Sequence, residues 1–204
     1  MIFIIIPNKK ASSGFIFTKS RYSEDKNIVP FRKKVIKMKH VYITMGTEHY
    51  LRQVLDEIPS NGVELFQNYE QSLLYHETEQ ENVFREGASY RILQMFGERK
   101  HAGVLVLEYL SIRDEEIPIF LADFDAMRKQ LLKQLGFQAA RLAQEVHHQK
   151  FLIVSFWDSE DAYRLFSKNE HHSKIMQRIQ QAGNQANFSH TDIYHYPAFR
   201  HDSK

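Results

Sequence analysis

Residues 150–177 read KFLIVSFWDSEDAYRLFSKNEHHSKIMQ, and this stretch decides the fold. Its first part, residues 150–157, is an apolar run rich in aromatic and branched side chains, which is typical of a buried strand. Asp158 or Ser159 can then cap a helix, and the acidic residues that follow suit its positive end. A turn at 167–169 separates this helix from a second one. The stretch therefore predicts a buried strand followed by two short helices.

Apolar spacing predicts the elements of the preceding residues in the same way. Residues 104–112 are expected to be a strand, 118–135 an amphipathic helix ended by Gly136, and 137–146 a strand that pairs with 150–157. A last strand is expected at 189–196. This order, β-α-β-β-α-β, is that of a ferredoxin-like unit with an antiparallel sheet. We place this C-terminal unit at 101–204.

A smaller unit is expected at 38–100. Its predicted elements are a strand at 41–45, a helix at 48–57 capped by Thr47, a hairpin of 63–66 with 72–76, and a second helix at 87–96 ended by Gly97. The sequence therefore predicts a βαββα half-unit that packs against the C-terminal unit within one chain. The fold class is α+β, with antiparallel sheets and helices on their outer face.

Charge is distributed unevenly along the chain. Residues 1–37 carry nine basic and two acidic side chains, a net charge of +7, whereas the rest carries 18 basic and 23 acidic ones, a net charge of −5. An acidic body argues against nucleic-acid binding, which needs a basic surface. The leader has no regular periodicity and no signal-peptide layout. We therefore expect 1–37 to be a disordered or non-native leader, with translation starting at Met38, although a basic tail that touches a membrane or nucleic acid remains an alternative.

Two absences limit the class of protein further. The chain has no cysteine, which excludes thiol chemistry and suits a reducing cytoplasm. It also has no apolar run near the roughly 18 residues of a membrane-spanning helix. A glycine-rich phosphate loop and a Ser-His-Asp order are missing too, so nucleotide-binding and hydrolase functions rank low.

The pattern FLIVSFWDSEDAYRLF, residues 151–166, resembles the antibiotic-biosynthesis-monooxygenase superfamily, whose units form dimeric α/β barrels. From Met38 on, with MKHVYITMGT and LLYHET, the chain is similar to the two-domain haem-degrading monooxygenases of Gram-positive bacteria. It is also similar to the staphylococcal regulatory protein TRAP. The resemblance implies oxidative cleavage of haem in a cavity between sheet and helices, or a non-enzymatic role in signalling or stress. The partner would be haem or another small hydrophobic ligand, bound by a monomer with internally paired units or by a homodimer.

The resemblance also implies positions for the site. The family's asparagine, tryptophan and iron-binding histidine fall on Glu108, Phe166 and Met176, so all three positions are substituted. We take Glu108 and Phe166 as candidate catalytic residues, and Met176 and Trp157 as candidate haem-binding residues. Met can ligate haem iron, but Met176 and Phe166 also have the spacing of core residues. A lone carboxyl on the apolar face of a strand costs several kcal/mol unless it is paired or neutral.

Two adjacent histidines are the candidate iron ligands. His172 lies four residues before Met176, on the same helical face, and His171 precedes it. A solvated helix start is the alternative interpretation of both residues. Imidazole is the common protein ligand of haem iron, so the sequence favours His172 or His171 over Met176.

Overall fold

The computed structural model describes residues 38–58, 62–100, 103–146, 150–182 and 189–197, all of which belong to one compact unit. The leader, residues 1–37, lies outside the described residues, and so does the prediction made for it. None of the described helices is long and apolar enough to cross a membrane.

The first elements follow the predicted order. Strand β1 (His40–Gly46) leads into helix α1 (Glu48–Glu57), and strands β2 (Val63–Gln67) and β3 (Ser72–Thr78) form the expected antiparallel hairpin. The side chain of Thr47 accepts a hydrogen bond from the backbone N–H of Tyr50, as predicted for a helix cap. Helix α1 has the same bounds as the predicted helix.

The helix predicted at 87–96 is wrong, because these residues form strand β4 (Ala88–Gly97). Tyr90 and Ile92 turn into the apolar interior, and an irregularity between Ile92 and Gln94 shifts the register, so that Phe96 packs on the opposite face. This shift breaks the two-residue period that would have indicated a strand. The N-terminal half therefore contains four strands and one helix among its described residues.

The C-terminal half has the predicted order. Its elements are β5 (Val104–Ser111), a short 3-10 turn (Asp114–Glu116), α2 (Ile117–Leu131), β6 (Phe137–Glu145), β7 (Lys150–Trp157), α3 (Glu160–Ser167), α4 (Glu170–Ala182) and β8 (His190–His195). Helix α2 ends four residues earlier than predicted. The four strands pair antiparallel, with β5 between β7 and β8.

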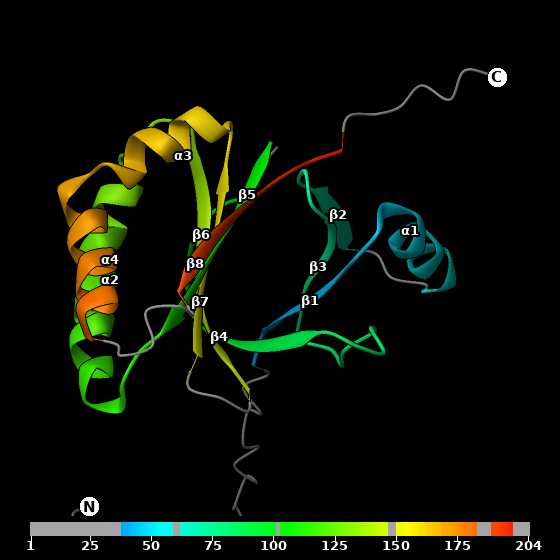
Figure 1. Cartoon of the computed structure of the whole chain (residues 1–204), viewed down its shortest axis with the longest axis horizontal. Coiled ribbons are helices and arrows are strands. Elements are labelled where there is room, and N and C mark those ends of the chain that lie inside the picture. The colour runs from blue at the N-terminus through cyan, green and yellow to red at the C-terminus, as the bar shows by residue number, and fades with distance from the viewer. Residues whose placement is uncertain (1–37, 59–61, 101–102, 147–149, 183–188, 198–204) are drawn as a thin grey trace, which may run out of the picture. The chain divides into compact units, whose positions relative to one another are not determined.

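The two halves share one closed barrel, with the strand order β1-β3-β2-β8-β5-β7-β6-β4 (Figure 1). Strand β4 pairs with β1 on one side and with β6 on the other, while β2 meets β8 through Gln67 and His195. The expectation that both units pack together within one chain is thus confirmed. The strand that was predicted as a helix is the one that joins them.

Apolar side chains fill three layers. The barrel interior is one core, in which Phe66, Tyr75, Phe156 and Tyr194 are fully buried. Helix α1 covers the outside of β1–β3. Helices α2, α3 and α4 cover the outside of the C-terminal strands (Figure 1).

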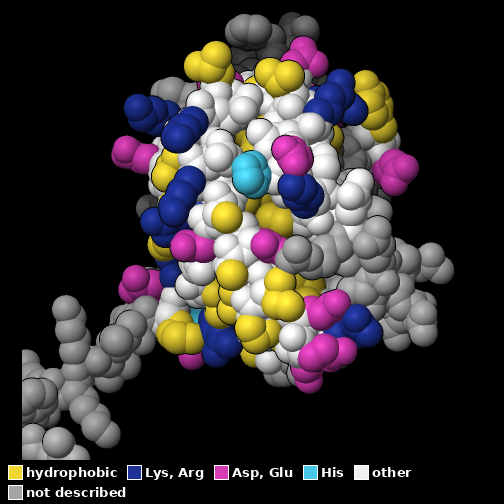
Figure 2. All heavy atoms as spheres, turned by 90° about the vertical axis from the view of Figure 1, so that its left-hand side faces the viewer, with side chains coloured by type: hydrophobic (Ala, Val, Ile, Leu, Met, Phe, Trp, Pro, Cys, Tyr) yellow, Lys and Arg dark blue, Asp and Glu magenta, His cyan; other side chains and the backbone are white. Residues whose placement is uncertain are grey.

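The outer side of the α2–α4 layer is mixed in character. Figure 2 shows charged side chains of both signs on this face, among apolar ones. Ile119, Leu132 and Leu165 are among its exposed apolar residues. The helices therefore bury one face against the sheet and present a face of mixed charged and apolar side chains to solvent.

We predict that Gly97→Ala destabilises the barrel by more than about 2 kcal/mol. Gly97 has φ +74°, and a Cβ atom there would lie 2.2 Å from the carbonyl oxygen of Gln138 on the neighbouring strand. Urea unfolding measures the loss. Gly62→Ala is the control, because Gly62 also has a positive φ, +107°, but no atom within 4 Å of its added Cβ. Equal losses in both variants would refute a role for close packing at Gly97.

Candidate functional site

Glu108 is a carboxyl group buried between the sheet and the helices. It lies on β5 with Val106 and Leu110 as neighbours on the same face, and only 2% of its surface is exposed. The imidazole Nε2 of His172 lies 2.6 Å from Glu108 Oε1. The hydroxyl of Tyr163 donates a hydrogen bond of 3.0 Å to the same oxygen. The lone polar residue of this strand face is therefore paired.

Helices α3 and α4 bring these partners to the sheet. Ser159 caps α3 by accepting from the N–H of Ala162, and the apolar face of α3 then buries Tyr163 and Phe166. The chain turns after Ser167, where Asn169 N–H donates to the carbonyl of Phe166. This turn starts α4 so that His172 points back to the sheet. The predicted turn at 167–169 thus determines where the imidazole lies.

Both ring nitrogens of His172 face acceptors. Nδ1 lies 3.1 Å from the carbonyl oxygen of Ser167, opposite the contact of Nε2 with Glu108. Burial alone would lower the pKa of His172, but the hydrogen bond and charge of Glu108, helped by the Ser167 carbonyl, raise it above the ordinary imidazole value. The contacts with Glu108 and Ser167 therefore favour the protonated form of the imidazole.

The hydroxyl of Tyr163 is a permanent donor. Burial and the neighbouring charge of Glu108 raise the pKa of Tyr163 far above its usual value. The network therefore links α3, β5 and α4 through Glu108 Oε1.

Aromatic rings surround the pair. Trp157 is fully buried, its indole N–H donates to Ser155 Oγ at 2.9 Å, and its ring contacts Tyr163 and Phe166. The ring of Phe166 lies 5.3 Å from that of His172, centroid to centroid. The polar network thus stands in an apolar, aromatic environment, where a charge interaction is stronger than in water.

The structure brings together four of the six predicted site residues: Glu108, Trp157, Phe166 and His172. Met176 follows one helical turn later and packs, partly buried, against the same core. His171 is exposed, and its backbone N–H donates to Asn169 Oδ1. His171 and His172, although adjacent, therefore occupy different environments.

Sequence reasoning missed Tyr163 as a site residue. Tyr163 was assigned only to the apolar face of a helix, and its spacing gives no sign of the hydroxyl contact with Glu108.

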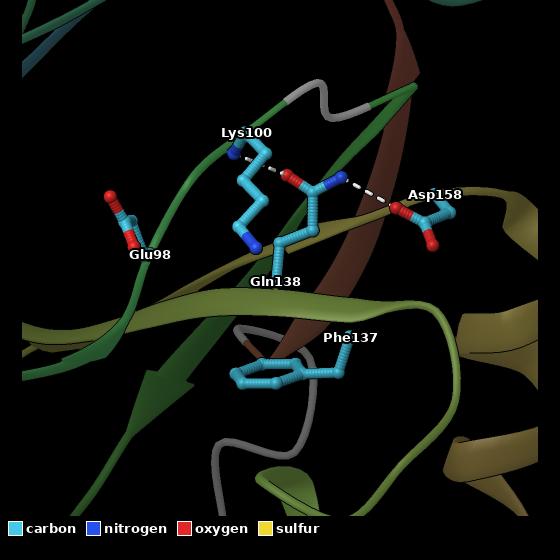
Figure 3. Close-up of a pocket in the computed structure, with 5 residues that line it drawn as sticks. All are labelled: Glu98, Lys100, Phe137, Gln138 and Asp158. Carbon is cyan, nitrogen blue, oxygen red and sulfur yellow. Dashed lines mark hydrogen bonds between the residues drawn. The ribbon is translucent and has the colours of Figure 1, made fainter.

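A second feature is a pocket of about 500 Å³ at the rim of the barrel (Figure 3). Its lining is mostly polar: Glu98, Lys100, Phe137, Gln138 and Asp158. The side chain of Gln138 links two of them, accepting from the N–H of Lys100 and donating to Asp158. Phe137 also contacts Trp157, so the pocket borders the aromatic cluster. Among the described residues, no group of three or more acidic or histidine side chains could hold a metal ion.

Comparison with known proteins adds independent information. The antibiotic biosynthesis monooxygenase family matches residues 103–178, which include all six predicted site residues. A protein of Listeria monocytogenes named heme-degrading monooxygenase is 46% identical over 167 residues, covering 82% of this chain and all of the relative.

Solved structures agree with this match. The heme-degrading enzyme LmHde of L. monocytogenes is 44% identical, with a TM-score of 0.67 over 78% of this chain and 99% of that one. A major regulator of staphylococcal pathogenesis has the same TM-score and coverage at only 16% identity, and therefore shows a shared fold alone.

We predict that Glu108→Gln destabilises the protein by about 3 kcal/mol at pH 6, because it leaves a buried imidazolium without its partner. The pair's contribution is fully present below the unfolded histidine pKa of about 6.5 and is lost as pH rises through the raised folded pKa. At pH 9, the free energy of unfolding of the variant should therefore be much closer to that of the wild type. Urea unfolding at both pH values measures the difference.

Glu77→Gln is the matched control. Glu77 is a buried carboxylate of the barrel interior, with Lys39 Nζ at 2.7 Å and Arg141 Nε at 3.0 Å. Lys and Arg stay charged at pH 6 and pH 9, so the cost of this substitution should be the same at both. A pH-independent cost for Glu108→Gln as well would contradict a charged His172.

Proposed function

Because the chain belongs to the family of the haem-degrading monooxygenases and carries an antibiotic biosynthesis monooxygenase domain at 103–178, we propose that it binds haem and cleaves it oxidatively. The observation that carries this proposal is the buried Glu108–His172 pair between the sheet and the helices. It provides an imidazole and a proton-carrying group in an apolar, aromatic layer, inside the matched domain.

The chemistry of this layer fits haem. A flat porphyrin needs apolar and aromatic walls, and Val106, Leu110, Trp157 and Phe166 provide them. An imidazole is a suitable protein ligand for its iron. In the haem-free chain the same residues pack against one another, so a bound haem would require α4 to move away from the sheet.

His172 is the proposed iron ligand, and Glu108 is the proposed base that removes its proton. An imidazole binds iron through a nitrogen lone pair, so a cationic His172 must first release the proton on Nε2. Glu108 Oε1, 2.6 Å away, is placed to accept this proton. Nδ1 keeps its contact with the Ser167 carbonyl, which orients the ring.

The transferred proton gives Glu108 a second role. A carboxylate only accepts hydrogen bonds, whereas a protonated carboxyl also donates one. With haem bound, Glu108 would then be able to donate a hydrogen bond towards the cofactor, from the position where the family has an asparagine amide. Phe166 and Trp157 exclude water from this proton. Dioxygen and electrons from an external reductant complete the reaction.

The assembly and its setting follow from the fold. In a dimeric α/β barrel, two chains are needed to close the barrel. Here a single chain closes it, so we propose that a monomer is sufficient for haem binding. The absence of cysteine suits work in a reducing cytoplasm. The non-enzymatic alternative has only the shared fold of the staphylococcal regulator in its favour.

Haem titration tests the function. We expect haem to give a Soret band with the purified chain, and ascorbate under air to make that band decay. A chain that gives no band, or a stable one, would contradict haem degradation and favour the regulatory alternative.

We further predict that His172→Ala weakens haem binding at least tenfold and abolishes the decay, because it removes the imidazole of the buried layer. His171→Ala is the matched control: it removes the adjacent, exposed imidazole and should bind haem as the wild type does. If the band survives when both His171 and His172 are replaced by Ala, the iron ligand lies elsewhere, and Met176 is the next candidate.

A further inference from the structure

Two donors converge on a single oxygen of Glu108. Both Tyr163 and His172 bond to Oε1, at 3.0 and 2.6 Å. If His172 turns to haem iron, one of these bonds is lost. We propose that Tyr163 is a positioning residue, whose hydroxyl keeps the Glu108 carboxyl aimed at the haem layer after His172 has left it. This inference rests on the proposed function.

Tyr163 has anchors outside α4, and its ring also lies edge-on to that of His172, at 6.4 Å between centroids. It lies on α3, one turn after the Ser159 cap, and is 5% exposed. Its ring packs edge-on against Trp157 of β7, at 5.8 Å between centroids. His172 lies beyond the turn that follows Ser167, on the next helix. A movement of α4 can therefore break the contact of His172 with Glu108 and leave that of Tyr163 intact.

The single hydrogen of the Tyr163 hydroxyl is committed to Glu108. A tyrosine hydroxyl has one hydrogen to donate, and this one goes to Glu108 Oε1 at 3.0 Å. The carboxyl is therefore held from α3 as well as from α4.

The barrel interior contains a matched arrangement with no haem role. The hydroxyl of Tyr75 donates to Glu77 Oε2 at 3.0 Å, and Glu77 also binds the cation of Arg141. Tyr75 is fully buried on the other side of the sheet layer. Tyr75→Phe thus removes the same kind of hydrogen bond from the same kind of carboxylate, away from the site.

Steady-state haem degradation separates the two tyrosines. We expect Tyr163→Phe to lower kcat at least tenfold while leaving the haem Kd within twofold, and Tyr75→Phe to leave both within twofold. A kcat in Tyr163→Phe close to that of the wild type would overturn the proposal. So would a loss confined to haem affinity, since that would make Tyr163 a binding residue.

A second measurement does not depend on activity. Haem-free crystals of His172→Leu should show Glu108 in its present orientation, held by Tyr163, and those of His172→Leu with Tyr163→Phe should show it in another rotamer. The same Glu108 rotamer in both would overturn the positioning role. This comparison still decides if the wild type fails to degrade haem, in which case the proposed function falls separately. His172→Ala replaces the leucine variant if that one does not fold.

Discussion

A carboxylate inside an apolar layer has to be paired, and the pairing of Glu108 determines how the helical layer sits on the sheet. Burying an unpaired charge costs several kcal/mol, and the sheet around Glu108 offers mostly apolar neighbours. Its partners come from α3 and α4 instead. The contact of His172 with Glu108 is therefore the polar link between β5 and α4, inside a layer that is otherwise held by apolar packing.

Successive side chains of β5 point to opposite faces of the sheet, so the two faces of this strand have different functions. Leu105 and Leu107 face the barrel interior, while Val106, Glu108 and Leu110 face the helices. Each side contains a buried carboxylate with a tyrosine and a cation: Glu77 with Tyr75 and Arg141 inside, and Glu108 with Tyr163 and His172 outside. An arginine does not lose its proton under physiological conditions, whereas a histidine does. The inner network can only stabilise the barrel, and the outer one can exchange a proton.

The sequence was informative wherever a single period extended through a whole element. The apolar run 150–157 and the helical spacing of 48–57 gave elements with the observed bounds. Strand β4 was missed because the irregularity after Ile92 changes the face of every later residue, which imitates a helical pattern. The network was found in part: Glu108 was conspicuous as the polar residue of an apolar face. Tyr163 was not, because its hydroxyl contact joins residues 55 positions apart, and only the tertiary fold places them together.

The departures from the family pattern at positions 108 and 176 can be explained together. The family resemblance places an amide at the position of Glu108 and an iron-binding histidine at that of Met176. A carboxylate at 108 requires a cationic partner within hydrogen-bonding reach, which an amide does not. His172, one turn before Met176 on α4, meets this requirement because the turn after Ser167 aims it at β5. The acid at 108 and the histidine at 172 therefore depend on each other. A histidine at 176 in place of the one at 172 would leave Glu108 with the neutral Tyr163 hydroxyl but without its imidazole partner, and an amide at 108 would leave His172 without the acceptor for its proton.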